Sequence, residues 1–205
     1  LVMAFDKYHQ KNMLILYDAV GTLADSVGPA LNQPEYIDML MQPLTARWAS
    51  LDDTDPDLIP LLECMASVTI AMGPGFQPHA VPVFQRCVNI IHQNLVAYEQ
   101  AMTQPSTADD ELPDRTFLIV ALDLLSGLCQ GLGVQSQELV ANVQPLILPQ
   151  LLPCLTNIEP PVRQSAFALL GDLAINAFPQ LKPYLSTHMP LILSQISPEQ
   201  MHETL

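Results

Sequence analysis

The stretch that decides the fold is residues 160–178, which read Pro-Pro-Val-Arg-Gln-Ser-Ala-Phe-Ala-Leu-Leu-Gly-Asp-Leu-Ala-Ile-Asn-Ala-Phe. Two prolines mark its start, Arg163 follows in the first turn, and small residues lie along one face. Proline is tolerated in the first turn of a helix, and the apolar residues recur at helical spacing. The stretch therefore predicts one amphipathic helix, and its relatives elsewhere in the chain decide how that helix is packed.

Three other segments align with this helix without gaps. The four aligned segments are eight residues long and start at residues 18, 63, 123 and 168, so the starts are 45, 60 and 45 residues apart. The third position is always apolar, the fourth and fifth are small or polar, and the sixth is Leu or Val. A period near 45 is typical of HEAT repeats, for which roughly 40–47 residues are expected. We therefore expect an all-α HEAT-repeat superhelical solenoid of about four to five helical pairs, with residues 1–205 as a single array.

The helical pattern covers most of the chain. We expect the end of a helix in residues 1–10 and further helices over about 12–27, 35–50, 57–72, 79–102, 114–132, 136–156, 160–178 and 181–195. In the second of these, the apolar stripe consists of Leu14, Tyr17, Val20, Leu23, Ala24 and Val27. The wider spacing in the middle of the chain contains a long helix and an acidic, proline-bounded loop over about 104–113, so the insertion is local.

Charge and hydropathy restrict the class of partner. The chain of 205 residues carries 21 acids and 7 bases, a net charge of −14. Such a surface repels nucleic acid and anionic membranes and attracts basic partners. No uninterrupted apolar run approaches the ~18 residues of a membrane span. The chain lacks an initial Met and a signal-peptide pattern, and we interpret it as a piece of a longer protein.

Catalytic and metal-binding patterns are weak. The four cysteines (Cys64, Cys87, Cys129 and Cys154) lie in apolar helical segments without CxxC spacing. They indicate buried free thiols in a reducing compartment, with a zinc site or disulfides as the alternative. The five histidines are scattered, and His79 and His92 are expected at the surface or at helix ends. We therefore expect no enzyme activity, no cofactor and no metal.

Acids recur on the aligned helices. Asp18, Thr22 and Asp25 are spaced i, i+4 and i+7, which puts them on one helix face. The other helices carry related sets: Glu63 with Ser67, Asp123 with Ser126 and Gln130, and Asp172 with Asn176. If these helices line the inside of the curve, their acids form a groove for an extended basic peptide, held by charge-assisted hydrogen bonds. The alternative is an ordinary solvated helix face.

Five blocks of the sequence resemble the karyopherin-β family of nuclear import receptors. They are residues 14–28 (Leu-Ile-Leu-Tyr-Asp-Ala-Val-Gly-Thr-Leu-Ala-Asp-Ser-Val-Gly), 57–64, 82–89, 120–128 and 162–172. The resemblance follows the chain in order over nearly its whole length. It implies a section of a receptor that binds extended basic nuclear localisation signals ending in a Pro-Tyr pair and releases them when the GTPase Ran binds. It also implies shuttling between cytoplasm and nucleus, contact of the full-length receptor with nucleoporins, and a monomer.

The resemblance also implies roles for individual residues. Asp18 and Thr22 would meet an arginine of the signal, with Asp25 beside them, and Glu63 and Ser67 would extend the acidic track. Asp123, Ser126 and Asp172 would face the N-terminal segment of the signal. Gln130 departs from the family pattern, in which an acid is common, and Trp48 is expected to serve packing on the outer layer. The remaining alternative is a HEAT scaffold without a transport role, with an enzyme less favoured still.

Overall fold

The computed structural model describes residues 2–5, 7, 12–103 and 114–195, and these ranges contain helices and turns but no strand. Short 3-10 helices join the α-helices. The α-helices are α1 (Val2–Phe5), α2 (Met13–Val27), α3 (Pro34–Ser50), α4 (Leu58–Met72), α5 (Gln77–Thr103), α6 (Thr116–Leu132), α7 (Ser136–Asn142), α8 (Ile147–Leu155), α9 (Pro160–Asn176), α10 (Phe178–Leu181) and α11 (Leu185–Gln195). The predicted all-α class is confirmed.

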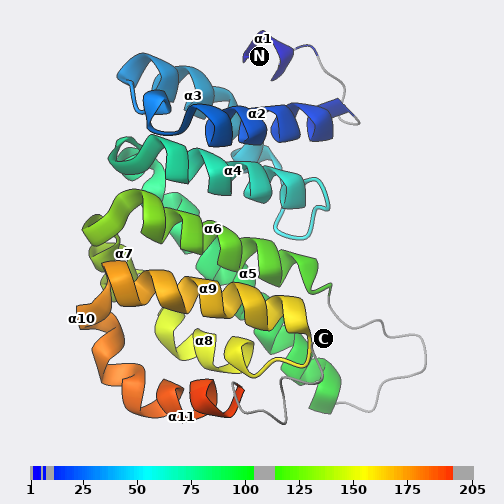
Figure 1. Ribbon diagram of the computed structural model, residues 1–205. Helices are drawn as coiled ribbons and strands as arrows, with labels where there is room; N and C mark the ends of the chain where they lie inside the picture. The colour runs from blue at the N-terminus through cyan, green and yellow to red at the C-terminus, as the bar shows by residue number, and fades with distance from the viewer. Residues whose placement is uncertain (1, 6, 8–11, 104–113, 196–205) are drawn as a thin grey trace.

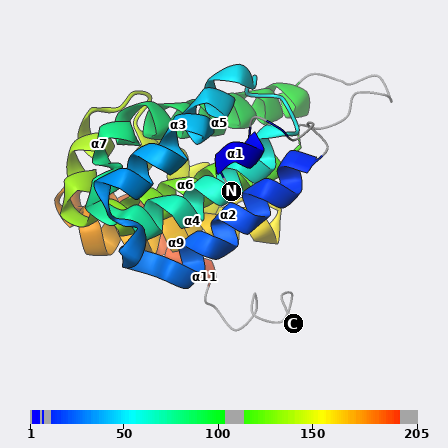
Figure 2. The same cartoon turned by 90° about the horizontal axis from the view of Figure 1, so that it is seen from above.

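The helices form two layers. Helices α2, α4, α6 and α9 stack side by side in chain order, each packed against the next, and we call them the inner layer (Figure 1). Helices α3, α5 and α8 lie behind them, with α5 packed against α6 and α8 against α9. Seen along the stack, α3 and α5 lie on one side and α2, α4 and α9 on the other (Figure 2). This two-layer stack is the predicted HEAT-repeat architecture, in which each repeat buries its apolar face against its neighbours.

The inner-layer helices pack in one repeated register. We number the aligned segments from 1 to 8 and call the contacts α2–α4, α4–α6 and α6–α9 the first, second and third junctions. Position 4 of each helix faces position 5 of the next: a Cβ on Gly21 would lie 3.8 Å from Ser67, and one on Gly127 would lie 3.0 Å from the Ala66 carbonyl oxygen. At the third junction the Ser126 hydroxyl donates a hydrogen bond to Asp172. The junctions therefore share one register and differ in the side chains that meet across it.

Three inner-layer helices end in the same way. Gly28, Gly73 and Gly133 follow α2, α4 and α6 with φ of 51°, 53° and 55°, a region that only glycine adopts at little cost. The backbone N–H of each glycine donates to the carbonyl four residues earlier. These glycines are 45 and 60 residues apart, as the repeat is. At the end of α9 the corresponding position is Phe178, and the helix stops earlier, at Asn176.

Three sequence-based helix boundaries are corrected. The helix expected over 136–156 is two helices, α7 and α8, because Val143 and Leu146 are extended and Pro145 has no N–H to donate. The helix expected over 160–178 ends at Asn176 because Ala177 leaves the helical region. The segment expected as one helix over 181–195 consists of the end of α10, a 3-10 turn over 182–184 and α11.

The apolar stripe predicted for residues 12–27 is also partly wrong. Tyr17, Val20 and Ala24 are buried as expected, but three other members, Leu14, Leu23 and Val27, are exposed. Met13 and Leu16 are buried in their place. The buried face of α2 therefore includes Met13 and Leu16, and its acids Asp18 and Asp25 lie on the exposed side of the helix.

In the outer layer, Arg86 of α5 contacts the end of α3 and the residues that follow it. The Arg86 guanidinium on α5 donates to the carbonyl oxygens of Trp48 and Leu51, and its Nε lies 2.6 Å from Asp53 Oδ1. Its central carbon also lies 4.8 Å from the centre of the Trp48 ring, which is buried. Trp48 is therefore a packing residue on the outer layer, as predicted, and Arg86 joins α5 to the connection between α3 and α4.

The four cysteines are buried and free, as predicted. Burial raises the pKa of the Cys64, Cys129 and Cys154 thiols to about 12. A thiol with so high a pKa holds almost no reactive thiolate at neutral pH. These side chains therefore act as small apolar core residues.

Two stretches, Leu58–Thr103 and Thr116–Asn142, are long and apolar enough to cross a membrane by length and composition alone. More than half of the apolar window in each is buried within the helical stack, which is how core helices pass the same test. The first stretch is also interrupted by the turn at Gly73. The predicted acidic loop over 104–113 lies outside the described residues, and the assignment of residues 1–205 to a single array stays a prediction.

Candidate functional site

The predicted site residues all lie on the inner layer, in two groups. The first group lines one pocket of about 460 Å³ between α2 and α4 and consists of Asp18, Thr22, Asp25, Glu63 and Ser67. The second group lies on α6 and α9 and consists of Asp123, Ser126 and Asp172. The fold thus brings five of the eight residues into one pocket and places the other three along the same layer, at the third junction.

The pocket exists because glycine occupies position 4 of α2. The atoms nearest to a Cβ on Gly21 would be Ser67 Oγ and Cys64 Cα, both 3.8 Å away, so no side chain fills the space between the helices. Tyr17 and Cys64, both buried, contribute to the lining. One end of the pocket is apolar and is formed by Leu14, Ile15 and Pro60. Leu14 and Ile15 are 52% and 68% exposed, so their side chains are open to anything that enters this end of the pocket.

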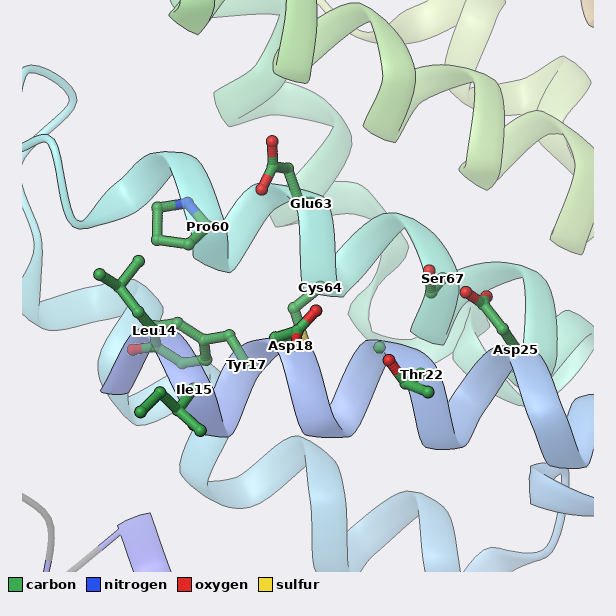
Figure 3. A pocket seen from close by; sticks show the side chains of 11 residues that line it. Leu14, Ile15, Tyr17, Asp18, Thr22, Asp25, Pro60, Glu63, Cys64 and Ser67 are labelled. Atoms are coloured by element: carbon green, nitrogen blue, oxygen red, sulfur yellow. The ribbon is translucent and has the colours of Figure 1, made fainter. Parts of the chain in front are cut away.

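The polar side chains are arranged along the length of this pocket (Figure 3). Asp18, Thr22 and Asp25 follow one another along α2, and Asp25 lies beside Ser67 at the far end. Glu63 extends from α4 on the side away from α2. Asp18, Thr22, Asp25 and Glu63 are exposed, while Ser67 is half-buried. Three carboxylates and two hydroxyls thus offer only hydrogen-bond acceptors and rotatable O–H groups to anything that enters.

The carboxylates of the pocket have no basic partner in the ranges that the structure describes. The ion pair found there joins Arg86 to Asp53, on the outer side of the fold. The other arginines are engaged elsewhere: Arg47 donates to the Tyr17 hydroxyl, Arg115 stacks on the Tyr98 ring, and Arg163 donates to the carbonyl oxygens of Asn157 and Ile158. The negative potential of the pocket is therefore not neutralised by described cations, which favours a cationic ligand.

The third junction has the same register but a different chemistry. Asp172 Oδ2 accepts one hydrogen bond from the Ser126 hydroxyl and another, of 3.0 Å, from Gln130 Nε2. Gln130 Nε2 also lies 3.4 Å from Ser126 Oγ. Ser126 is only 5% exposed, and Asp172 is half-buried. These three side chains are joined by hydrogen bonds at the positions that line the open pocket at the first junction.

Asp123 lies one turn before Ser126 on α6 and remains exposed. Partial burial between α6 and α9 raises the pKa of its carboxyl group, and a hydrogen bond with Ser165 of α9 lowers the pKa by a smaller amount. The net direction is upward, because removing water from a carboxylate disfavours its charged form. A cationic partner would therefore stabilise the charged form of the Asp123 carboxyl group.

Among the residues that the structure describes, the histidines do not form a reactive group with an acid and a nucleophile. His92 is exposed, and the half-buried His79 ring lies 5.8 Å from the Phe76 ring near the start of α5. Within the described ranges no three His, Cys, Asp or Glu side chains are placed to hold a metal ion. Sequence reasoning missed Gly21 and the apolar end of the pocket. The available signal was Ile15, an apolar residue beside Leu14 that lies outside the predicted apolar stripe.

Known proteins similar to this chain carry two related names. Transportin-1 of Homo sapiens is 52% identical over 200 residues, which cover 97% of this chain and 22% of that protein. Transportin-1 of Oryza sativa subsp. japonica is 44% identical over 205 residues, and importin subunit beta-2 of Schizosaccharomyces pombe is 42% identical over 202 residues. Each of these matches covers 22% of the relative, and no protein-family model matches the chain.

The matches run over nearly all of this chain, so the two-layer helical stack and the inner-layer acids both fall within the aligned section. The chain spans about a fifth of the length of the relatives that it matches. Over that section, the chain belongs to the transportin (importin beta-2) family.

Proposed function

We propose that this chain is a cargo-binding section of a nuclear import receptor and that its inner layer holds an extended basic nuclear localisation signal of the Pro-Tyr type. The observation that supports this most directly is the pocket between α2 and α4, whose three carboxylates have no described basic partner. The relatives are named transportin and importin subunit beta-2, and a transport role fits those names.

The pocket fits an arginine side chain better than other cations. A guanidinium presents five N–H donors in a fixed plane, and Asp18, Thr22 and Asp25 present acceptors along one face of α2. The apolar end, formed by Leu14, Ile15 and Pro60, would cover the aliphatic stem of that arginine or an apolar neighbour in the peptide. Glu63 and Ser67 would extend the contact on α4.

We further propose that the peptide continues along the inner layer toward α6 and α9, with this layer as the concave side of the solenoid. Asp123 would then be the next exposed carboxylate on its path. The whole receptor would bind cargo signals, Ran and nucleoporins, and would shuttle between cytoplasm and nucleus as a monomer. Its role would be transport and not catalysis, and neither nucleic acid nor membrane would be a ligand, in keeping with the net charge of −14.

A peptide titration with matched charge changes tests the proposal. In the intact protein that carries this section, Asp18→Asn plus Glu63→Gln should weaken binding of an arginine-containing signal by about three- to tenfold, since exposed ion pairs contribute ~0.2–1 kcal/mol each. The control, Glu35→Gln plus Asp38→Asn, removes the same charge from exposed acids of α3 on the outer layer and should leave binding within about twofold. Equal losses in the two double variants would mean that the pocket is not the binding site.

The alternative function is a HEAT scaffold that assembles other proteins through its outer ridges. The observation in its favour is the exposure of Tyr36 and Met39 on α3, which are 48% and 52% exposed. These residues flank Asp38 and follow Glu35, so the control variant also reports on this surface. A partner that is lost from the α3 variant and retained by the pocket variant would favour the scaffold.

A further inference from the structure

We propose that Ser126, Gln130 and Asp172 form a polar clasp that joins α6 to α9 and withdraws the Asp172 carboxylate from the peptide, so that Gln130 decides whether the third junction accepts a basic residue. The peptide part of this inference rests on the proposed function, whereas the clasp itself does not. It differs from the sequence-based expectation that Ser126 and Asp172 face the signal.

The hydrogen bonds define the clasp. A single oxygen of Asp172, Oδ2, accepts from both the Ser126 hydroxyl and Gln130 Nε2. An ionised carboxylate can only accept, so the part of the Gln130 amide that faces it must be the NH₂ group. A peptide guanidinium that approached this oxygen would have to displace two donors that the fold already provides.

Burial makes that displacement unfavourable. Ser126 is 5% exposed, so its hydroxyl would lose its partner in a place that water does not reach freely. A further hydrogen bond continues the attachment of α9: Gln137 Nε2 donates to the Asn176 carbonyl oxygen at 3.0 Å. This bond satisfies a carbonyl in the last turn of α9, where no intrahelical donor remains. The polar contacts thus run along the C-terminal half of α9.

The repeat register shows what is special about these positions. Ser126 is at position 4 of α6, Asp172 at position 5 of α9, and Gln130 at position 8 of α6. At the first junction the same positions hold Gly21, Ser67 and Asp25, which line the open pocket. The acid and the neutral residue have exchanged places: the first junction has an acid at position 8, and the third has it at position 5. Only at the third junction does a neutral donor occupy position 8 and face the carboxylate.

A negative charge at residue 130 should therefore turn the third junction into a site that binds a basic residue. Glutamate at this position would replace the donor that lies 3.0 Å from Asp172 Oδ2 by a second carboxylate. Two carboxylates at that separation repel each other and bind a cation between them more favourably than either does alone. In this chain, Gln130 adds no second carboxylate and donates to the one that Asp172 provides, so the segment of the signal that passes α6 and α9 need not be basic.

Two variants of an exposed residue separate the parts of the proposal. Gln130→Met removes the donor without adding charge, and Gln130→Glu removes the donor and adds charge; both are made in the intact protein. Hydrogen–deuterium exchange of α6 and α9 amides reports on the clasp. The affinities of two synthetic signals report on specificity: the signals share an arginine for the first junction and differ in their N-terminal segment, which is Lys/Arg-rich in one and Gly/Ser-rich in the other.

We expect both variants to accelerate exchange in the C-terminal half of α9 by about fivefold, the factor that corresponds to one lost hydrogen bond. Gln130→Met should leave the affinity ratio of the two signals within about twofold, and Gln130→Glu should raise it at least fivefold in favour of the basic signal. Unchanged exchange in both variants would overturn the clasp. An unchanged ratio in Gln130→Glu would overturn the role of Gln130 in specificity.

The exchange measurement also distinguishes this inference from the proposed function. If neither signal bound the unmodified protein, the proposed function would fail. The clasp would then be decided by exchange alone: acceleration in Gln130→Met supports it, and unchanged protection contradicts it.

Discussion

At the first junction a glycine faces a serine, and at the third a serine faces an aspartate. Gly21 and Ser67 leave a pocket of about 460 Å³, whereas Ser126 and Asp172 are joined by a hydrogen bond. The helices α2–α4 and α6–α9 pack in the same register, so the fold is the same at both places. What differs is whether two positions carry side chains that reach one another. A solenoid can therefore keep its backbone unchanged and open or close its inner surface one junction at a time.

The second junction shows how close this packing can become. A Cβ on Gly127 would lie 2.9 Å from Thr69 Oγ1 and 3.0 Å from the Ala66 carbonyl oxygen, and one on Gly131 would clash with the Thr69 carbonyl. The backbones of α4 and α6 thus approach each other across two glycines. Between the open first junction and the bonded third one, this junction is closed by direct backbone contact.

The largest effect should come from adding one methyl group at the second junction. We expect Gly127→Ala to destabilise the protein by about 2 kcal/mol, because the contact is against backbone that cannot move freely. Urea-induced unfolding measures the change. Gly171→Ala is the control, because nothing lies within 4 Å of a Cβ there. It should stabilise the protein by about 0.5–1 kcal/mol through helix propensity alone. Equal effects of the two substitutions would contradict the close approach.

The next largest effect is expected on replacing Ser126, and it is compared with the replacement of Ser67, the serine that faces a neighbouring helix at the first junction. Ser126→Ala should cost about 1–1.5 kcal/mol in the free energy of unfolding, because Asp172 loses a donor at a half-buried site. Ser67→Ala should change it by less than about 0.5 kcal/mol, since within the described ranges Ser67 forms no hydrogen bond. The same unfolding experiment applies. A larger loss for Ser67→Ala would mean that the first junction is held by contacts that the pocket geometry does not show.

A smaller effect of opposite sign is expected at the first junction. A Cβ on Gly21 would meet its nearest atoms at 3.8 Å, an ordinary van der Waals separation. We therefore expect Gly21→Ala to stabilise the protein by about 0.5–1 kcal/mol, because glycine is unfavourable within a helix. Thermal unfolding would show a higher Tm. A lower Tm would indicate that the two helices are closer in solution than here and that the pocket is narrower.

The smallest effect concerns Asp123 and pH. Its folded-state pKa is raised above the ordinary value of 3.8. In the pH window between the unfolded-state and folded-state pKa values, the native state therefore holds more protons than the unfolded state. Stability therefore falls as pH rises through the window, and the cost persists at higher pH. Asp123→Asn should remove a cost of less than about 0.5 kcal/mol at neutral pH, since solvent screens this exposed group. The two proteins should unfold alike below pH ~3. If Asp123→Asn became less stable than the unmodified protein as pH rises, the pKa of Asp123 would be lowered by folding and not raised.

Much of this architecture could be predicted from residue patterns. The spacing of 45, 60 and 45 residues between aligned segments predicts the repeat, and the acids at positions 1 and 8 of α2 predict which face stays free. Local backbone rules set other details that the patterns did not reveal. Val143 and Leu146 are extended on either side of Gln144 and Pro145, so α7 and α8 are separate helices. Leu23 is exposed although the corresponding residues Val68, Leu128 and Leu173 are buried, because α2 has fewer neighbours.

The sequence by itself determined the class of fold, the order of the helices and the acidic character of one face, because hydrophobic periodicity and charge are properties of single segments. Only the tertiary structure decided that position 4 faces position 5 across every junction. That pairing depends on how two helices approach, which no single segment specifies. It is the reason that Gly21 leaves a pocket, that Gly127 permits backbone contact, and that Ser126 and Gln130 reach Asp172.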